Sequence, residues 1–264
     1  MRENIIQKIW QSGGAVVNGW LHIPSSYSAE VMTHQGFDSL TIDLQHGPVH
    51  YDTAIPMLQA ISTTDVVPLA RVPWNEPGII MKMLDVGCYG IICPMVNNRA
   101  ECEAFVGACR YPPIGYRSNG PNRARLYAGD DYGVGSNDTV LALAMIETAE
   151  AMENLDEIMS VPGLSGVYVG PADLSISLKG GMPPDIYSDQ VVDAHKEIIA
   201  AAKRHNIYPG VHCSSPQHAT DMIEMGYRLV TLLSDAAFLA KEASNAVAEV
   251  RQTKLAQSSG GNLY

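Results

Sequence analysis

Two acidic residues of the chain follow stretches that read as neighbouring parallel strands. Glu147 ends the apolar run 140–146, and Asp173 comes shortly after the run 167–170. Consecutive parallel strands point their C-terminal ends to the same side, so we expect the two carboxylates to share a small space, where like charges repel. A hard divalent cation removes that conflict, because Mg²⁺ is typically held by one or two carboxylates plus waters and substrate oxygens. The pair therefore predicts a metal site.

Other polar side chains fall at predicted strand ends on the same side. Asp43 and His46 follow the second strand and Arg71 ends the third. Each residue also has a purely structural interpretation: a surface histidine, a salt-bridged arginine, an N-cap for a short helix over 174–178 at Asp173, or a pairing of Glu147 with a barrel arginine. Together they favour a site, because several charged groups at one face are costly without a ligand.

The residue types indicate chemistry on a 2-oxo acid. A cation would leave positions for the keto and carboxylate oxygens of a ligand such as pyruvate. The run Gly170-Pro171-Ala172-Asp173 enters a predicted helix N-terminus, whose free N–H groups attract a carboxylate. Arg71 would neutralise the oxygen that becomes an enolate, His46 would move the proton, and Asp43 would orient the His46 ring and keep it basic.

Eight short apolar runs alternate with amphipathic stretches and predict the elements that position these residues. Each run is rich in Val, Ile and Leu, as expected for strands covered on both faces. Eight βα units in a chain of this length predict an α/β fold, a (β/α)₈ TIM barrel. The alternative, a doubly wound open sheet, is disfavoured because the first strand is not followed by a Gly-x-Gly-x-x-Gly motif. The predicted strands are Gly14–Trp20, Ser39–Asp43, Val66–Arg71, Gly90–Met95, Leu141–Glu147, Gly166–Gly170, Pro209–His212 and Leu229–Leu233.

The positions of the lysines disfavour activation through an imine, which needs a lysine projecting from a barrel strand. We expect every lysine to lie in a helical stretch, except Lys179 in a glycine-rich loop; the others are Lys8, Lys82, Lys196, Lys203, Lys241 and Lys254.

Length and composition predict one large domain. The chain has 264 residues, 46% of them hydrophobic and 17% charged, which fits a single barrel over residues 1–256. We expect the tail 257–264 to be disordered. Two connections, 111–139 and 178–189, are too long for plain βα turns, and such stretches are often lids or subunit contacts.

Charge and hydrophobic pattern argue against nucleic acid or a membrane as a partner, and the cysteines indicate the compartment. A formal net charge of −11 gives no reason to expect nucleic acid or an anionic membrane. The N-terminus lacks an apolar signal core, and the longest apolar runs are too short to span a bilayer. The chain has five cysteines without CxxC spacing, so we expect reduced, buried thiols in a cytoplasmic protein.

A set of motifs, specific in combination, resembles the HpcH/HpaI aldolases. These are class II, metal-dependent pyruvate aldolases of the 4-hydroxy-2-oxoheptanedioate and 2-keto-3-deoxy sugar-acid type. The resemblance runs from residue 19 to about 240, and its main marks are residues 37–47 (FDSLTIDLQHG), 70–73 (ARVP), 84–87 (LDVG), 93–96 (CPMV), 110–118 (RYPPIGYRS), 146–148 (IET) and 169–175 (VGPADLS).

The resemblance implies a barrel of the phosphoenolpyruvate/pyruvate type and roles for individual residues. It implies Glu147 and Asp173 as ligands of Mg²⁺, Mn²⁺ or Co²⁺, His46 as acid/base and Arg71 as the stabiliser of the enolate, while Asp85 raises the basicity of the histidine. The backbone around Ala172 and Asp173, with Gly170 and Pro171, would receive the substrate carboxylate. Trp20 would wall the pocket or pack in the core. Members are hexamers with an exchanged C-terminal helix, so a neighbouring subunit would complete the site.

The chain departs from the family pattern at two positions. Gln45 stands where many members carry Glu, which removes a negative charge near the base. Met145 stands where many have Gln, and a thioether cannot donate a hydrogen bond to substrate. Both departures leave the identity of the substrate open.

The resulting hypothesis is an aldehyde-lyase that reversibly cleaves 4-hydroxy-2-oxo acids to pyruvate or hydroxypyruvate and an aldehyde, in aromatic or sugar-acid catabolism. Two alternatives use the same scaffold. One is a lyase acting on citryl- or malyl-CoA, and the other is a non-catalytic barrel that binds an oxo acid.

Overall fold

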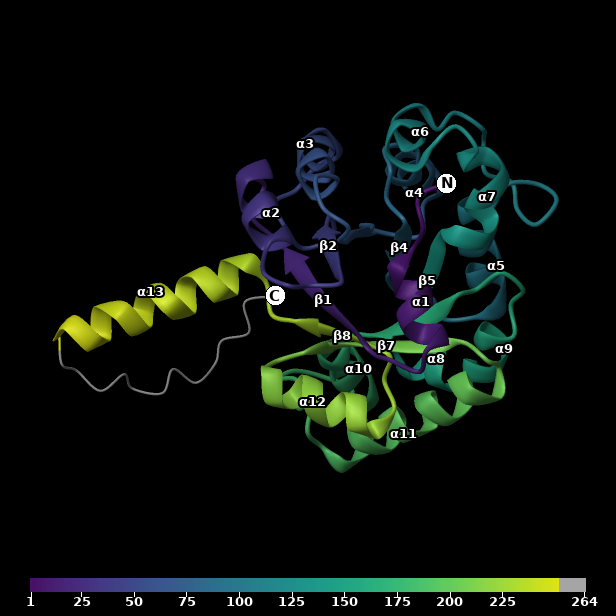
Figure 1. The fold of residues 1–264 in the computed structure, drawn as a ribbon. Helices are drawn as coiled ribbons and strands as arrows, with labels where there is room; N and C mark the ends of the chain where they lie inside the picture. The colour runs from purple at the N-terminus through teal and green to yellow at the C-terminus, as the bar shows by residue number, and fades with distance from the viewer. Residues whose placement is uncertain (252–264) are drawn as a thin grey trace.

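The chain folds into a closed barrel of eight parallel strands, β1 to β8, each paired with the next and β8 paired with β1 (Figure 1). The computed structural model describes residues 1–251. The strands are Val16–Leu21, Ser39–Asp43, Val67–Arg71, Gly90–Cys93, Leu141–Ile146, Gly166–Val169, Tyr208–Cys213 and Leu229–Leu232. The predicted (β/α)₈ fold is confirmed, and the strand ends differ from the predicted ones by at most two residues. The predicted domain end at 256 and the tail 257–264 lie outside the described residues.

Helices surround the barrel and connect successive strands (Figure 1). In chain order, α1 to α13 span Ile5–Gln11, Ser26–Thr33, Tyr51–Ile61, Pro77–Asp85, Arg99–Cys109, Asn122–Ala128, Tyr132–Thr139, Ala149–Glu153, Leu155–Met159, Pro171–Lys179, Asp189–Arg204, Pro216–Met225 and Asp235–Arg251. Side-chain caps define the starts of several of them; Ser25, for example, accepts the backbone N–H of Ser28 at the start of α2.

Alternation along the strands divides the core into two clusters. In β5, Leu141, Leu143 and Met145 belong to the cluster inside the barrel. The residues between them pack outward, in the cluster between strands and helices. Successive side chains of a strand point to opposite faces. Glu147 follows Ile146, so the alternation points its side chain toward the barrel axis.

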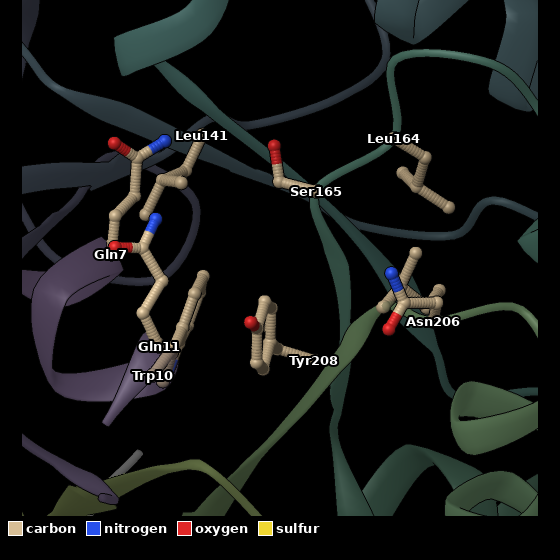
Figure 2. A pocket seen from close by; sticks show the side chains of 9 residues that line it. Gln7, Trp10, Gln11, Leu141, Leu164, Ser165, Asn206 and Tyr208 are labelled. Carbon is tan, nitrogen blue, oxygen red and sulfur yellow. The ribbon is translucent and has the colours of Figure 1, made fainter. Parts of the chain in front are cut away.

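Helix α1 covers the N-terminal end of the barrel. The indole of Trp10 stacks on Tyr208 with ring centroids 4.3 Å apart and donates a hydrogen bond of 2.7 Å to the carbonyl of Arg228. An open cavity of about 240 Å³ lies beside this stack, bordered by Gln7 and Asn206 among others (Figure 2). In barrels of this type the N-terminal end contributes stability, and chemistry occurs at the other end.

The structure describes one of the long connections and corrects the expected position of Lys179. The connection 111–139, expected to be too long for a plain βα turn, contains the helices α6 and α7. Lys179, expected in a glycine-rich loop, is the last residue of α10, and Gly180 follows it in the left-handed conformation. Every lysine among the described residues therefore lies in a helix, and the expectation that none projects from a strand is met within residues 1–251.

The last described helix, α13, extends away from the barrel (Figure 1). Leu239, Val247 and Val250 are exposed along it. Within residues 1–251, no helix combines the length and the apolar character needed to cross a membrane.

Replacing Trp10 with alanine should lower the free energy of unfolding by about 3–5 kcal/mol, the usual cost of removing a buried Trp side chain. Trp74 is 58% exposed, so Trp74→Ala should cost about 0.5 kcal/mol or less. Urea denaturation followed by circular dichroism measures both values. Equal losses for the two variants would show that the stack does not hold the end of the barrel closed.

Candidate active site

Several of the predicted site residues lie at the C-terminal ends of strands, on inward-facing positions. Asp43 ends β2 and Arg71 ends β3, and the two are paired in register across the sheet. Glu147 follows β5 directly. The strand ends thus bring together residues that are far apart in the sequence.

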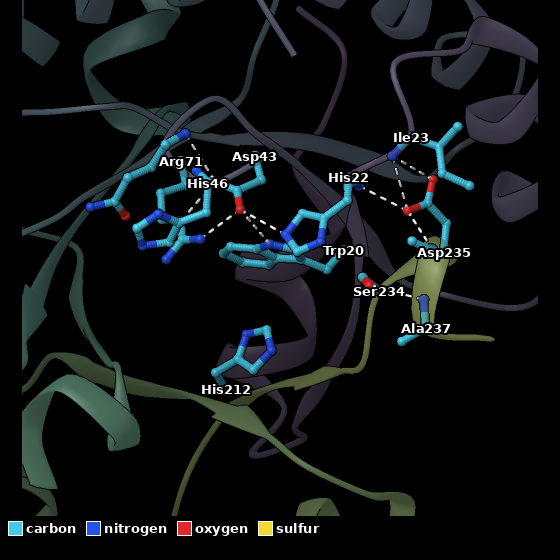
Figure 3. A network of polar contacts seen from close by, with 12 residues as sticks. Trp20, His22, Ile23, Asp43, His46, Arg71, His212, Ser234, Asp235 and Ala237 are labelled. Atoms are coloured by element: carbon cyan, nitrogen blue, oxygen red, sulfur yellow. Dashed lines mark hydrogen bonds and ion pairs between the residues drawn. The ribbon is translucent and has the colours of Figure 1, made fainter. Parts of the chain in front are cut away.

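Asp43 and Arg71 form a two-pronged ion pair in this face of the barrel (Figure 3). Arg71 Nε donates to Oδ1 at 2.9 Å, and Nη2 donates to Oδ2 at 2.6 Å. Paired N–H donors of this kind fix the guanidinium plane. No hydrogen bond to Nη1 of Arg71 is found among the described residues, so this nitrogen remains available to a ligand.

Three further groups, two from the end of β1 and one from the loop after β2, complete the environment of Asp43. Oδ2 also accepts Trp20 Nε1 at 3.1 Å and contacts His22 Nε2 at 2.8 Å (Figure 3), and Oδ1 accepts the backbone N–H of Gln45 at 3.0 Å. Burial raises the pKa of the Asp43 carboxyl, but the hydrogen bonds from His22 and Arg71 and the charge of Arg71 outweigh it, so the pKa falls well below its usual value. Asp43 is therefore a buried, permanently ionised carboxylate.

The expected contact between Asp43 and the imidazole of His46 is replaced by a backbone contact. Asp43 Oδ1 accepts the backbone N–H of His46 at 3.3 Å, and the ring makes no hydrogen bond within the described part of the chain. His46 is exposed at the mouth of the barrel. Burial and the charge of Arg71 lower its pKa, while Asp43 and Asp173 oppose that change. The imidazole is therefore neutral and free to accept a proton at neutral pH.

Glu147 lies almost completely buried, with 2% of its surface exposed. Its Oε1 accepts the backbone N–H of Met95 at 2.8 Å. Met95 has φ of 54°, an unusual conformation for a residue with a side chain. Burial raises the pKa of Glu147 to about 7; the Met95 hydrogen bond and Arg71 oppose the shift, and Asp173 adds to it.

Asp173 lies in the first turn of α10, whose N-cap is Gly170 without a side-chain hydrogen bond. The alternative interpretation of Asp173 as the N-cap of a short helix over 174–178 is therefore wrong, because the helix begins at Pro171. The N–H groups of Ala172 and Asp173 have no partner among the described residues. The exposed Asp173 carboxylate and these N–H groups are free to meet a ligand.

Gly170 keeps the backbone close to the Glu147 carboxylate. A Cβ built on Gly170 would lie 2.5 Å from Glu147 Oε2 and 3.1 Å from Met145 Cε. Any larger residue would displace the carboxylate. Met145, one of the departures from the family pattern, is thus buried beneath Glu147 and Gly170, and the other, Gln45, supports Asp43 through its backbone.

The donor set fits a hard divalent cation. Glu147 Oε2 receives no hydrogen bond from any described residue, and the negative charge of Asp173 is near enough to raise the pKa of Glu147. Within residues 1–251, no three His, Cys, Asp or Glu side chains gather as a metal cage. Two carboxylates with room for water and substrate oxygens match the way proteins usually hold Mg²⁺.

Asp85 has surroundings that the sequence did not predict, whereas Trp20 packs in the core, one of its two expected placements. Asp85 ends α4, and its Oδ1 accepts Arg117 Nη2 at 2.7 Å; no hydrogen bond joins it to His46 in the described chain. Trp20 is 1% exposed. Its ring lies 4.9 Å from the Arg71 guanidinium carbon, so the indole supports the arginine from below.

Sequence reasoning missed His22 and the backbone of Met95. The predicted first strand ended at Trp20, whereas β1 continues to Leu21 and places His22 at its end with the inward parity of Trp20. The rule that found Asp43 and Arg71 would have found His22 with the correct strand end. No sequence signal marks the positive φ of Met95.

Comparison with known proteins identifies the family to which the chain belongs. A family model described as HpcH/HpaI aldolase/citrate lyase matches residues 19–241. The chain belongs to this family. The hydroxypyruvate/pyruvate aldolase of Rhizorhabdus wittichii is 38% identical over 248 residues, which cover 94% of the chain and 99% of that protein.

Two further members of the HpcH/HpaI family support this assignment. The 4-hydroxy-2-oxo-heptane-1,7-dioate aldolase of Escherichia coli is 36% identical over 244 residues, covering 91% of the chain and 92% of that protein. A crystal structure of a HpcH/HpaI aldolase/citrate lyase family protein from Burkholderia cenocepacia has a TM-score of 0.86 at 28% identity and covers 94% of the chain and 99% of its own. The similarity thus extends over the whole barrel.

Cation binding by this family member should depend on pH through Glu147. Because the pKa of Glu147 is raised to about 7 and a bound cation needs the ionised carboxylate, affinity for Mn²⁺ should rise about tenfold per pH unit below 7 and level off above it. Isothermal titration calorimetry between pH 5.5 and 8.5 measures this. Glu147→Gln should bind weakly without that dependence, and the exposed Glu153→Gln should behave as the unaltered protein; a Glu147→Gln variant with unaltered affinity would remove Glu147 as a ligand.

Proposed function

We propose that the protein is an aldolase that reversibly cleaves 4-hydroxy-2-oxo acids into pyruvate or hydroxypyruvate and an aldehyde, using a divalent cation such as Mg²⁺, Mn²⁺ or Co²⁺. The observation that carries the proposal is the grouping of Glu147 and Asp173 with the free Nη1 of Arg71 and the exposed ring of His46 at one end of the barrel. The activities named for two relatives, at 36% and 38% identity, agree with this chemistry.

Glu147 and Asp173 would hold the cation, which when bound polarises the keto group of the substrate. The substrate carboxylate would lie at the start of α10, where the N–H groups of Ala172 and Asp173 are free and Pro171 has none to offer. Helix dipole and N–H donors both favour an anion there. The substrate would thus be oriented through its keto group by the cation and through its carboxylate by the N–H groups.

Arg71 would stabilise the negative charge that develops on the keto oxygen when the carbon–carbon bond breaks. Its Nε and Nη2 are committed to Asp43, so Nη1 is the donor left for substrate. A fixed donor costs little reorganisation during the reaction. In this proposal Asp43 acts by positioning Arg71, and Trp20 supports the same guanidinium from below.

His46 would remove the proton from the 4-hydroxyl group in cleavage and return it in the addition reaction. Its lowered pKa leaves the imidazole neutral at pH 7, the form that accepts a proton. Its exposure at the barrel mouth gives it access to the aldehyde half of the substrate.

The assembly that we propose is a homohexamer with exchanged C-terminal helices. Support comes from α13, which leaves the barrel with Leu239 at 64% and Val250 at 85% exposure. Apolar side chains on a projecting helix gain free energy when a second copy covers them. Because Asp85 pairs with Arg117 and does not contact His46 within one chain, an effect of Asp85 on the histidine depends on such a neighbour.

Exchange of the methyl protons of pyruvate in D₂O tests the reaction directly. The protein with Mn²⁺ should exchange them, chelator should abolish the exchange, and His46→Ala should slow cleavage by about 10²–10⁴-fold through loss of the base. The exposed His50→Ala is the control and should leave both rates unchanged. Proton NMR follows the exchange.

The outcomes separate the proposed aldolase from its alternatives. Absence of exchange with every cation would exclude the aldolase. Release of CoA thioester from citryl- or malyl-CoA would support the lyase on that substrate class, and tight oxo-acid binding without turnover would indicate a binding barrel.

A further inference from the structure

His22 is the buried histidine next to the site that the proposed mechanism does not use. It follows β1 directly, has 8% of its surface exposed, and its Nε2 lies 2.8 Å from Asp43 Oδ2 (Figure 3). Inward parity, shared with Trp20, brings the ring to the carboxylate that holds Arg71. The question is what this contact supplies.

The direction of the hydrogen bond follows from the state of Asp43. An ionised carboxylate only accepts hydrogen bonds, so Nε2 of His22 carries the proton and donates. On the same oxygen, Oδ2, Arg71 Nη2 and Trp20 Nε1 also donate. Three donors from β1, its end and β3 therefore set the rotation of this carboxylate.

The backbone of His22 is itself anchored. Its N–H donates to Asp235 Oδ1 at 2.8 Å, and the N–H of Ile23 donates to the same carboxylate (Figure 3). Ser28 Oγ donates to Asp235 Oδ2 at 2.7 Å. Asp235 is buried and begins α13. The imidazole thus extends from a backbone that cannot easily shift.

His22 also contacts the loop that carries His46. A Cβ built on Gly47 would lie 3.5 Å from both the Cα and the Cδ2 of His22, and 2.5 Å from the carbonyl oxygen of Asp43. The turn from Asp43 to Gly47 therefore folds tightly against the histidine. The His22 side chain therefore contacts both Asp43, which holds Arg71, and the loop that carries His46, the proposed base.

We propose that His22 is a positioning residue of the proposed aldolase, which orients the Asp43 carboxylate and through it the Arg71 guanidinium. The inference rests on the proposed function, because Arg71 must act on the substrate for its orientation to matter. A small misplacement of such a donor costs a large part of the rate. Removal of the Nε2 donor takes away one of the three donors on Oδ2, so the Asp43 carboxylate shifts toward its remaining partners and the Arg71 guanidinium shifts with it.

Two substitutions separate the hydrogen bond from the volume of the ring. In His22→Gln the side-chain amide nitrogen reaches about as far as Nε2 and still donates, whereas His22→Leu fills similar space without a donor. His34→Gln and His34→Leu are matched controls on an exposed histidine at the end of α2. Each variant is assayed for pyruvate proton exchange and for aldol cleavage, and its fold is checked by thermal unfolding.

His22→Leu should lower kcat and kcat/KM together by about 10–100-fold, with KM little changed, because the lost interaction acts in the transition state. His22→Gln should keep the rate within about fivefold, and both His34 variants should match the unaltered protein. A purely structural role would not produce this rescue by glutamine in a protein that stays folded.

A double-mutant cycle with Arg71→Lys tests the route of the effect. If His22 acts through Arg71, the rate loss of His22→Leu should largely disappear in the Arg71→Lys background. Fully additive losses, equal losses for the Gln and Leu variants, or a His22→Leu variant with unaltered kcat would each overturn the proposal. Absence of exchange in the unaltered protein would instead overturn the proposed aldolase, so the two failures are distinguishable.

Discussion

The hydrogen bonding of one buried carboxylate organises this end of the barrel. Asp43 accepts six hydrogen bonds, from two nitrogens of Arg71, the indole of Trp20, the imidazole of His22 and the backbone N–H groups of Gln45 and His46. Burying a charge is costly unless it is fully paired, and here the partners come from β1, β2 and β3. Removing any one of them would leave a charge poorly compensated, so the geometry is strongly specified.

The second constraint is the opposite case, a buried carboxylate with few donors around it. Among the described residues Glu147 accepts one hydrogen bond, from the backbone of Met95, and it has a carboxylate neighbour in Asp173. Its pKa is raised while that of Asp43 is lowered, although both residues lie at the ends of strands of one barrel. Two carboxylates with such different environments suit different tasks: Asp43 holds the Arg71 side chain in place, and in the proposed aldolase Glu147 would exchange its proton for a cation.

The rest of the barrel holds Asp43 and Glu147 in place. Helix α1 closes the far end of the barrel through the stack of Trp10 on Tyr208, and the alternation of β5 turns Glu147 inward. Gly170 lets α10 begin beside that carboxylate, where a side chain would collide with it. Asp235, the first residue of α13, accepts the backbone N–H of His22 at the end of β1. The helix that leaves the barrel therefore begins next to His22, which contacts Asp43.

The sequence by itself predicted the barrel, because strand-length apolar runs that alternate with helical stretches require a parallel sheet covered on both faces, and eight such units in a chain of this length favour closure of that sheet. It also predicted that Asp43, Arg71 and Glu147 lie at one end of the barrel, since they stand at the ends of those runs. Only the tertiary structure decided their partners. Asp43 bonds to Arg71 and not to the ring of His46, Asp85 bonds to Arg117, and His22 joins the site, because hydrogen bonds between strands depend on register and rotamer, which the order of residues does not fix.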